Sequence, residues 1–195
     1  KKSLSFSYPL ILNALIFIFI MHFIKIYSYN YLSDNEMTQI SFVTRVMLII
    51  IVLHSGFNNF YYKKFFNTKE KKFDYKIFFN YFLILLLSSF LIFFIFPFLS
   101  SMFNLDLKID LIFILIFSYT FIWCVSTFLE QYLNKFYQNK YILNFSVISL
   151  IFYSLVIIYF EQFEMLERIC LAMIISVSIY FVLILSKVIS ILNGK

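Results

Sequence analysis

Six long apolar runs constrain the fold of this 195-residue chain more than any other feature of its sequence. Each run is close to the length of about 20 residues that an α-helix needs to cross the hydrocarbon core of a membrane. The predicted spans are residues 9–28, 37–61, 77–98, 111–129, 142–160 and 169–192. A membrane β-strand is about 10 residues long and alternates in polarity, which these runs do not. The sequence therefore predicts an all-α polytopic membrane protein, in which residues 1–195 form a single bundle of six transmembrane helices.

Composition favours the same class of protein. The chain is 63% hydrophobic and 13% charged, whereas soluble domains average about 45–50% and about 25%. A net charge of +6 in a soluble protein would favour nucleic acid as a partner. In this chain the positive charge is explained by membrane topology. We therefore expect membrane lipids as partners of the protein and do not expect nucleic acid as one.

Basic residues are distributed unevenly between the two ends of the predicted spans. Twelve of the sixteen lie at one end: Lys1, Lys2, Lys63, Lys64, Lys69, Lys71, Lys72, Lys76, Lys135, Lys140, Lys187 and Lys195. Only Lys108 and Arg168 lie at the other end. Because Lys and Arg concentrate on the cytoplasmic side of membrane proteins, we predict a bacterial cytoplasmic (inner) membrane protein with both termini in the cytoplasm. The first residue is Lys1 rather than Met, so we expect the chain to be part of a longer protein.

Motifs of enzymatic or metal chemistry are absent from the sequence. There is no HExxH, no G-x-S-x-G, no phosphate-binding glycine loop and no pair of carboxylates within a span. Cys124 and Cys170 both fall in apolar runs and are expected to be buried thiols. We therefore predict no catalytic residues, no metal, no cofactor and no enzymatic activity.

The clearest functional candidate is Arg45 in the second span. With helical spacing of about 100° per residue, one face of that span carries Thr38, Ser41, Arg45, Gly56 and Asn59. An arginine at this depth is costly unless it faces protein or water, so the face is expected to line a cavity with Arg45 as its charged centre. The alternatives are an arginine that extends to the membrane surface, or one that fixes helix packing without a ligand.

Other polar residues within the spans are weaker candidates. His22 and Lys25 share a face near the outer end of the first span, where the long Lys25 stem could also simply reach the interface. His54 lies on the opposite face of its helix from Arg45 and is expected to be a packing residue. Glu130 is expected to be a solvated carboxylate at headgroup level.

The segment SYPLILNALIFIFIMHFIKIYSYNYLSDNEMTQISFVTRV, followed by an apolar run and a basic loop, resembles the second half of bacterial O-antigen and capsular polysaccharide flippases. These belong to the multidrug/oligosaccharidyl-lipid/polysaccharide exporter superfamily. In the family pattern Pro9 opens the span, Lys25 stands at an arginine position, and Arg45 stands at a later basic position. The expected Asp, Gly and Tyr of the pattern are replaced by Ile24, Gln39 and Ser41.

The resemblance implies a fold, a substrate and a partner. Members of this family consist of two six-span bundles around a V-shaped cavity, so this chain would be the C-terminal bundle and an N-terminal six-span half its partner. The substrate would be an undecaprenyl-pyrophosphate-linked oligosaccharide, flipped for surface polysaccharide biosynthesis. Arg45 and Lys25 would bind its pyrophosphate in a cationic cavity, which Thr38, Ser41, Asn59 and His22 could line. The family tendency toward ion coupling cannot be assigned to a residue, since no Asp or Glu is expected inside a span.

Two other functions remain open at this point. The chain could be a membrane-embedded polysaccharide polymerase or another small membrane enzyme, although it lacks the large outer loop usual in such polymerases. It could also be a membrane partner or fragment that does not itself transport.

Overall fold

The computed structural model describes residues 2–67, 74–103, 105, 107 and 109–193, and side chains within them except in residues 2–6, 28–31 and 62–67. Several of the basic residues used for the topology prediction therefore lie outside the described residues, namely Lys1, Lys69, Lys71, Lys72, Lys108 and Lys195.

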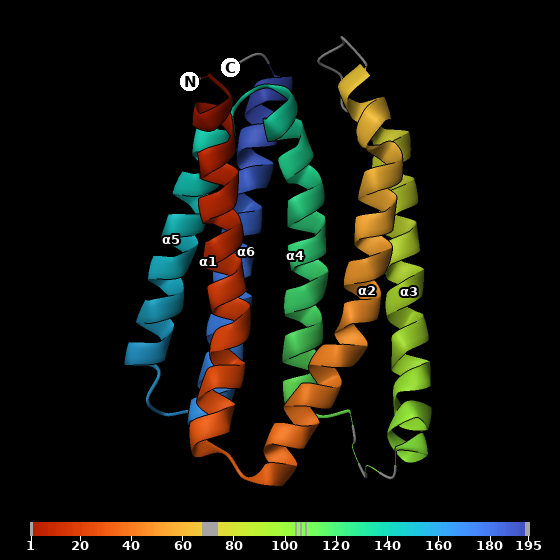
Figure 1. Ribbon diagram of the computed structural model, residues 1–195, viewed down its shortest axis with the longest axis vertical. Helices are drawn as coiled ribbons and strands as arrows, with labels where there is room; N and C mark the ends of the chain where they lie inside the picture. The colour runs from red at the N-terminus through yellow and green to blue at the C-terminus, as the bar shows by residue number, and fades with distance from the viewer. Residues whose placement is uncertain (1, 68–73, 104, 106, 108, 194–195) are drawn as a thin grey trace.

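Six α-helices account for nearly all of the described chain (Figure 1). They are α1 (Lys2–Tyr31), α2 (Asp34–Asn67), α3 (Tyr75–Met102), α4 (Leu111–Lys135), α5 (Asn139–Tyr159) and α6 (Met165–Leu192). Each contains a stretch that is long and apolar enough to cross a membrane. The chain is thus a multi-pass membrane protein, and the predicted all-α polytopic fold is confirmed.

Polar caps fix where several helices begin. Asp110 accepts a hydrogen bond from the backbone N–H of Phe113 at 2.8 Å, and Asp74 accepts one from that of Ile77 at 3.1 Å. Ser33 and Glu36 form a reciprocal capping box at the start of α2, with 2.9 Å between Ser33 N and Glu36 Oε2. These side chains satisfy backbone donors that the first turn of a helix leaves unpaired.

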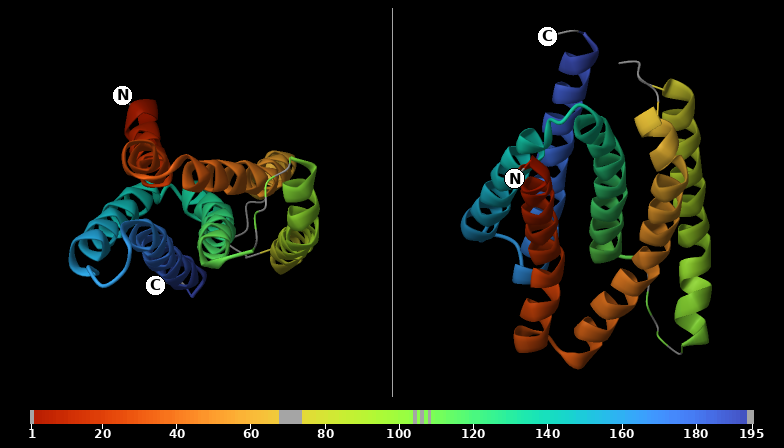
Figure 2. Two further views of the ribbon diagram at one scale, coloured as in Figure 1. Left: turned by 90° about the horizontal axis from the view of Figure 1, so that it is seen from below. Right: turned by 45° about the horizontal axis from the view of Figure 1, so that its top comes forward.

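The helices form a group of four, flanked by a pair. α6 packs along α4 and α5, and α1 packs along α5. α2 packs along α4, with α3 beside α2 on the far side of the group (Figure 2). α1 begins and α6 ends at the same end of the bundle, here called the terminal end. The α1–α2 loop lies at the opposite end, here called the loop end.

Aromatic side chains are found both in the core and on the outside of the bundle. Tyr81 of α3 stacks on Phe128 of α4 with ring centres 4.2 Å apart. Phe90, Phe94 and Phe98 of α3 are exposed on successive turns. Lipid chains are as apolar as such side chains, so an exposed apolar face is expected where a helix contacts the bilayer.

Candidate functional site

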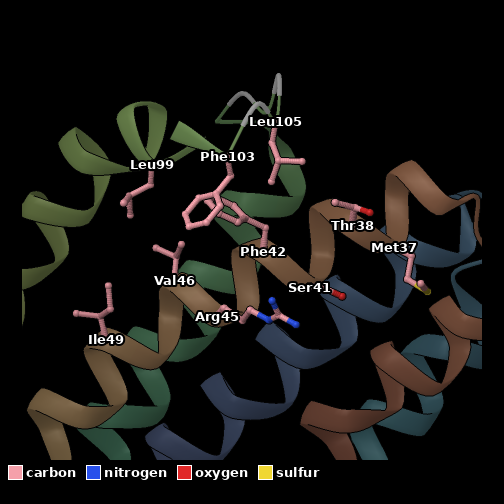
Figure 3. A pocket seen from close by; sticks show the side chains of 10 residues that line it. All are labelled: Met37, Thr38, Ser41, Phe42, Arg45, Val46, Ile49, Leu99, Phe103 and Leu105. Carbon is pink, nitrogen blue, oxygen red and sulfur yellow. The ribbon is translucent and has the colours of Figure 1, made fainter. Parts of the chain in front are cut away.

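A cavity lies between the loop-end part of α2 and the C-terminal end of α3, and we call it the Arg45 cavity (Figure 3). Its volume is about 530 Å³. Its lining residues are Met37, Thr38, Ser41, Phe42, Arg45, Val46, Ile49, Leu99, Phe103 and Leu105. The cavity is therefore mostly apolar, with one permanent positive charge in its wall.

Three of the predicted site residues meet in this cavity. Thr38, Ser41 and Arg45 follow one another at intervals of three and four residues, which places them on one face of α2. The Thr38 hydroxyl donates to the Asp34 carbonyl at 2.7 Å, so it is satisfied within its own helix. Arg45 is exposed and, in the part of the chain that the structure describes, has no hydrogen bond or ion pair. The donors of its guanidinium group are therefore available to an anion.

A second hollow lies on the other side of α2, between α1, α2 and α4, and we call it the α1 groove. Its volume is about 590 Å³. Its lining residues are Leu10, Asn13, Ala14, Phe17, Ile18, Met21, His22, Lys25, Thr44, Leu48, Ile51, Tyr119, Trp123, Thr127 and Glu130. Asn13 and Lys25 are both on α1, and at 1.5 Å rise per residue they lie about 18 Å apart along it. The groove is therefore elongated, with an apolar middle and polar ends.

Lys25 and His22 line the end of the α1 groove nearer the α1–α2 loop, and both are exposed. Neither has a hydrogen bond or ion pair among the described residues. The structure does not bring Lys25 and Arg45 into one cavity, because α2 separates them. Thr44 faces the α1 groove while its neighbour Arg45 lines the other cavity. Asn59 is exposed further along α2 and lines neither hollow.

The opposite end of the α1 groove contains a buried carboxyl group that the sequence interpretation misplaced. Glu130 was expected at headgroup level in solvent, but its side chain is only 7% exposed. Its Oε1 lies 2.9 Å from the Tyr180 hydroxyl of α6, and its Oε2 lies 3.5 Å from Asn13 Nδ2 of α1. The expectation that no carboxylate lies inside a span is therefore wrong.

The physical reason for this error is the length of α4. The apolar run ends at residue 129, but the helix continues to Lys135, so Glu130 lies more than one turn inside it. Helical spacing places Glu130 on the same face as Trp123 and Thr127, and this face lines the groove. That spacing was a signal in the sequence, but the depth of the residue depends on partners from α1 and α6.

His54 lies in the interface of α2 with α3 and α4, as expected of a packing residue. It is 4% exposed, with Nδ1 at 2.7 Å from the Tyr81 hydroxyl. Tyr81 donates its own hydrogen to the Cys124 carbonyl, so His54 Nδ1 carries the hydrogen and donates to Tyr81. His54 Nε2 is then the acceptor nitrogen, with the Asn58 amide at 2.9 Å and the Thr127 hydroxyl at 2.8 Å, and the Thr127 hydroxyl also lies within bonding distance of the Cys124 carbonyl. His54 thus contacts Thr127, which lines the α1 groove, from the side of Thr127 that faces α2 and α3.

The two cysteines are buried free thiols, which confirms that prediction. Among the described residues, no group of three or more His, Cys, Asp or Glu side chains is close enough to hold a metal ion. We found no family model, no curated protein and no solved structure that matches this chain.

Proposed function

We propose that this protein moves a lipid-linked oligosaccharide across the bacterial cytoplasmic membrane, with an undecaprenyl pyrophosphate carrier as the part that the helices bind. The observation that carries this proposal is Arg45, a guanidinium that lies in the wall of a mostly apolar cavity and has no hydrogen bond or ion pair within the described part of the chain. Arg45 lies about a third of the way along α2; an arginine costs about 2.5–3.5 kcal/mol on insertion scales at the centre of a span, and less nearer the membrane surface. An anionic ligand would explain a cation that lies within a span and has no hydrogen bond or ion pair among the described residues.

A pyrophosphate fits the chemistry of the Arg45 cavity. Its oxygens match the fork of guanidinium donors, which can bind two of them at once. The apolar residues around Arg45 match the prenyl chain that carries the pyrophosphate. Ser41 offers a hydroxyl in the same wall for a phosphate or sugar oxygen.

The α1 groove supplies a second polar contact under this proposal. Lys25 lies at its end nearer the α1–α2 loop, on the other side of α2 from Arg45, and offers a cation to a different part of the substrate. In the family that the sequence resembles, two bundles face one another across a V-shaped cavity. We propose that α1 and α2 form the wall of that cavity, which an N-terminal six-span half would complete. Alternating access would then be the rocking of one bundle against the other.

Binding to the purified protein in lipid nanodiscs tests this assignment. Native mass spectrometry should detect bound undecaprenyl pyrophosphate, whereas uncharged undecaprenol should bind much more weakly because it gives Arg45 no anion. Arg45→Ala should weaken pyrophosphate binding about tenfold or more, since a hydrogen bond to a charged group contributes about 1.5–3 kcal/mol.

Lys140→Ala is the matched control, because Lys140 is an exposed cation at the start of α5, away from both hollows. It should bind undecaprenyl pyrophosphate like the unchanged protein. Equal binding of undecaprenol and undecaprenyl pyrophosphate, or unchanged binding by Arg45→Ala, would remove the basis of the proposal.

A further inference from the structure

Three buried polar side chains from three helices meet at the terminal end of the α1 groove. They are Asn13 of α1, Glu130 of α4 and Tyr180 of α6. The Tyr180 hydroxyl lies 2.9 Å from Glu130 Oε1 and 3.0 Å from Asn13 Oδ1. Asn13 Nδ2 lies 3.5 Å from Glu130 Oε2, which closes a ring of three polar contacts.

This ring contains one hydrogen too few if Glu130 is ionised. Each of the three contacts needs one hydrogen between its two heavy atoms. Tyr180 has a single hydroxyl hydrogen, and the Asn13 amide nitrogen reaches only one of the other two groups. Reversing the Asn13 amide moves its nitrogen toward Tyr180, but it still supplies only one contact. In both orientations, two contacts are satisfied and the third requires a hydrogen from Glu130.

A protonated Glu130 satisfies all three contacts. Its carboxyl O–H donates to the Tyr180 oxygen, Tyr180 donates to Asn13 Oδ1, and Asn13 Nδ2 donates to Glu130 Oε2. The surroundings favour this state as well, because a buried carboxylate needs a cation or several donors. Within the described chain, Glu130 has no cationic partner.

Among the described residues, the Glu130 carboxyl group bonds only to Asn13 and Tyr180. Charged or titratable groups on the surrounding helices that do not bond to it include Tyr8, His22, Lys25, Arg45, His54, Tyr81, Tyr119, Cys124, Tyr141, Tyr153, Arg168, Cys170 and Lys187. Lys25 and His22 lie toward the far end of the groove, and His54 bonds to Tyr81, Asn58 and Thr127. The Lys187 ammonium lies 4.1 Å from the centre of the Tyr141 ring.

We propose that Glu130 is a proton-binding site of this protein, which exchanges its proton with water through the α1 groove. Glu130 and Asn13 both line that groove, so the ring is open to it on one side. When the Glu130 O–H bond breaks, the proton passes to water in the groove and the carboxylate keeps the electron pair. Tyr180 then turns its hydrogen from Asn13 to Glu130, and the ring that joins α1, α4 and α6 loses one contact.

The ring fits a proton better than a metal cation. Only four oxygen atoms converge there, two from Glu130 and one each from Asn13 and Tyr180. A hard cation such as Ca²⁺ requires six to eight oxygen ligands. A proton at Glu130 needs only the acceptor that Tyr180 supplies.

Infrared spectroscopy of the purified full chain in lipid nanodiscs tests this site without any substrate. At neutral pH the spectrum should contain the C=O band of a protonated carboxyl group, and this band should shift in D₂O. Raising the pH should remove it. Because this readout needs no ligand, it can fail while the flippase proposal stands, and the reverse also holds.

Variants assign the band to one residue. Glu130→Gln should abolish it, and should fold normally because its amide can replace the carboxyl O–H as a donor to Tyr180. Tyr180→Phe should raise the frequency of the band, because the carboxyl group loses a hydrogen-bond partner. Glu161→Gln, at an exposed loop position, should leave the band unchanged.

Three results would overturn the proposal. They are the absence of the band in the unchanged protein at neutral pH, its persistence in Glu130→Gln, and its loss when sodium replaces choline at constant pH. The last result would show that an alkali cation, not a proton, occupies the ring.

Discussion

The two histidines of this chain have opposite environments. His22 is exposed in the α1 groove and has no hydrogen bond among the described residues, whereas His54 is buried with three polar partners. The difference arises from their helix faces. His54 points toward α3 and α4, where the Tyr81 and Thr127 side chains complete its hydrogen bonds.

Replacing His54 should therefore destabilise the protein much more than replacing His22. His54→Ala leaves a cavity and removes the hydrogen-bond partner of the Asn58 amide, which should cost about 2 kcal/mol. His22→Ala should change stability by less than about 0.5 kcal/mol, as is usual for exposed positions. Chemical unfolding in detergent measures both. An equal loss of unfolding free energy in the two variants would contradict the buried role assigned to His54 and the exposed role assigned to His22.

At the scale of single helices, one capping side chain also joins its helix to a neighbouring helix. Asp110 caps α4 through the Phe113 N–H, and its second oxygen accepts a hydrogen bond from the Gln39 amide of α2. One side chain thus begins one helix and joins it to another, at the end of the bundle where the Arg45 cavity lies.

Asp110→Ala should cost about 1 kcal/mol or more, because it removes the cap and leaves Gln39 without this partner. Asp110→Asn should keep most of the stability, since asparagine caps helices equally well. Thermal unfolding of the two variants distinguishes these outcomes. If the Asn variant were as unstable as the Ala variant, the charge of Asp110 rather than its cap would be decisive.

The helices themselves were predictable, because each apolar run needs only its own length and composition to be recognised. The face of α2 that carries Thr38, Ser41 and Arg45 was also predictable from helical spacing. Which neighbouring helix each face of α2 contacts was not predictable from the sequence. Thr44 and Arg45 are about 100° apart around the helix, so the packing of α2 decides which hollow each residue enters. The ring at Glu130 depends on residues far apart in the sequence and was missed for the same reason.

At the scale of the whole molecule, the two ends of the bundle differ in charge. The basic residues predict that the terminal end faces the cytoplasm. Cys124 and Cys170 are both buried, so the unchanged chain provides a low background for thiol labelling.

Single cysteines at exposed sites at the two ends should report the orientation in intact cells. Lys140→Cys, at the start of α5, should be protected from a membrane-impermeant maleimide until the cytoplasmic membrane is opened. Glu161→Cys, in the loop after α5, should be labelled once the reagent has access to the outer face of that membrane. The reverse pattern would invert the predicted topology.

The proposed transport function concerns the molecule as a whole, and surface polysaccharide production tests it most directly. The gene, complete and in its native context, should restore surface polysaccharide to a strain that lacks its own flippase. Arg45→Ala should lose most of this activity at equal protein level, Arg45→Lys should retain part of it, and Lys140→Ala should match the unchanged protein. Wild-type amounts of surface polysaccharide from Arg45→Ala would contradict the role assigned to Arg45.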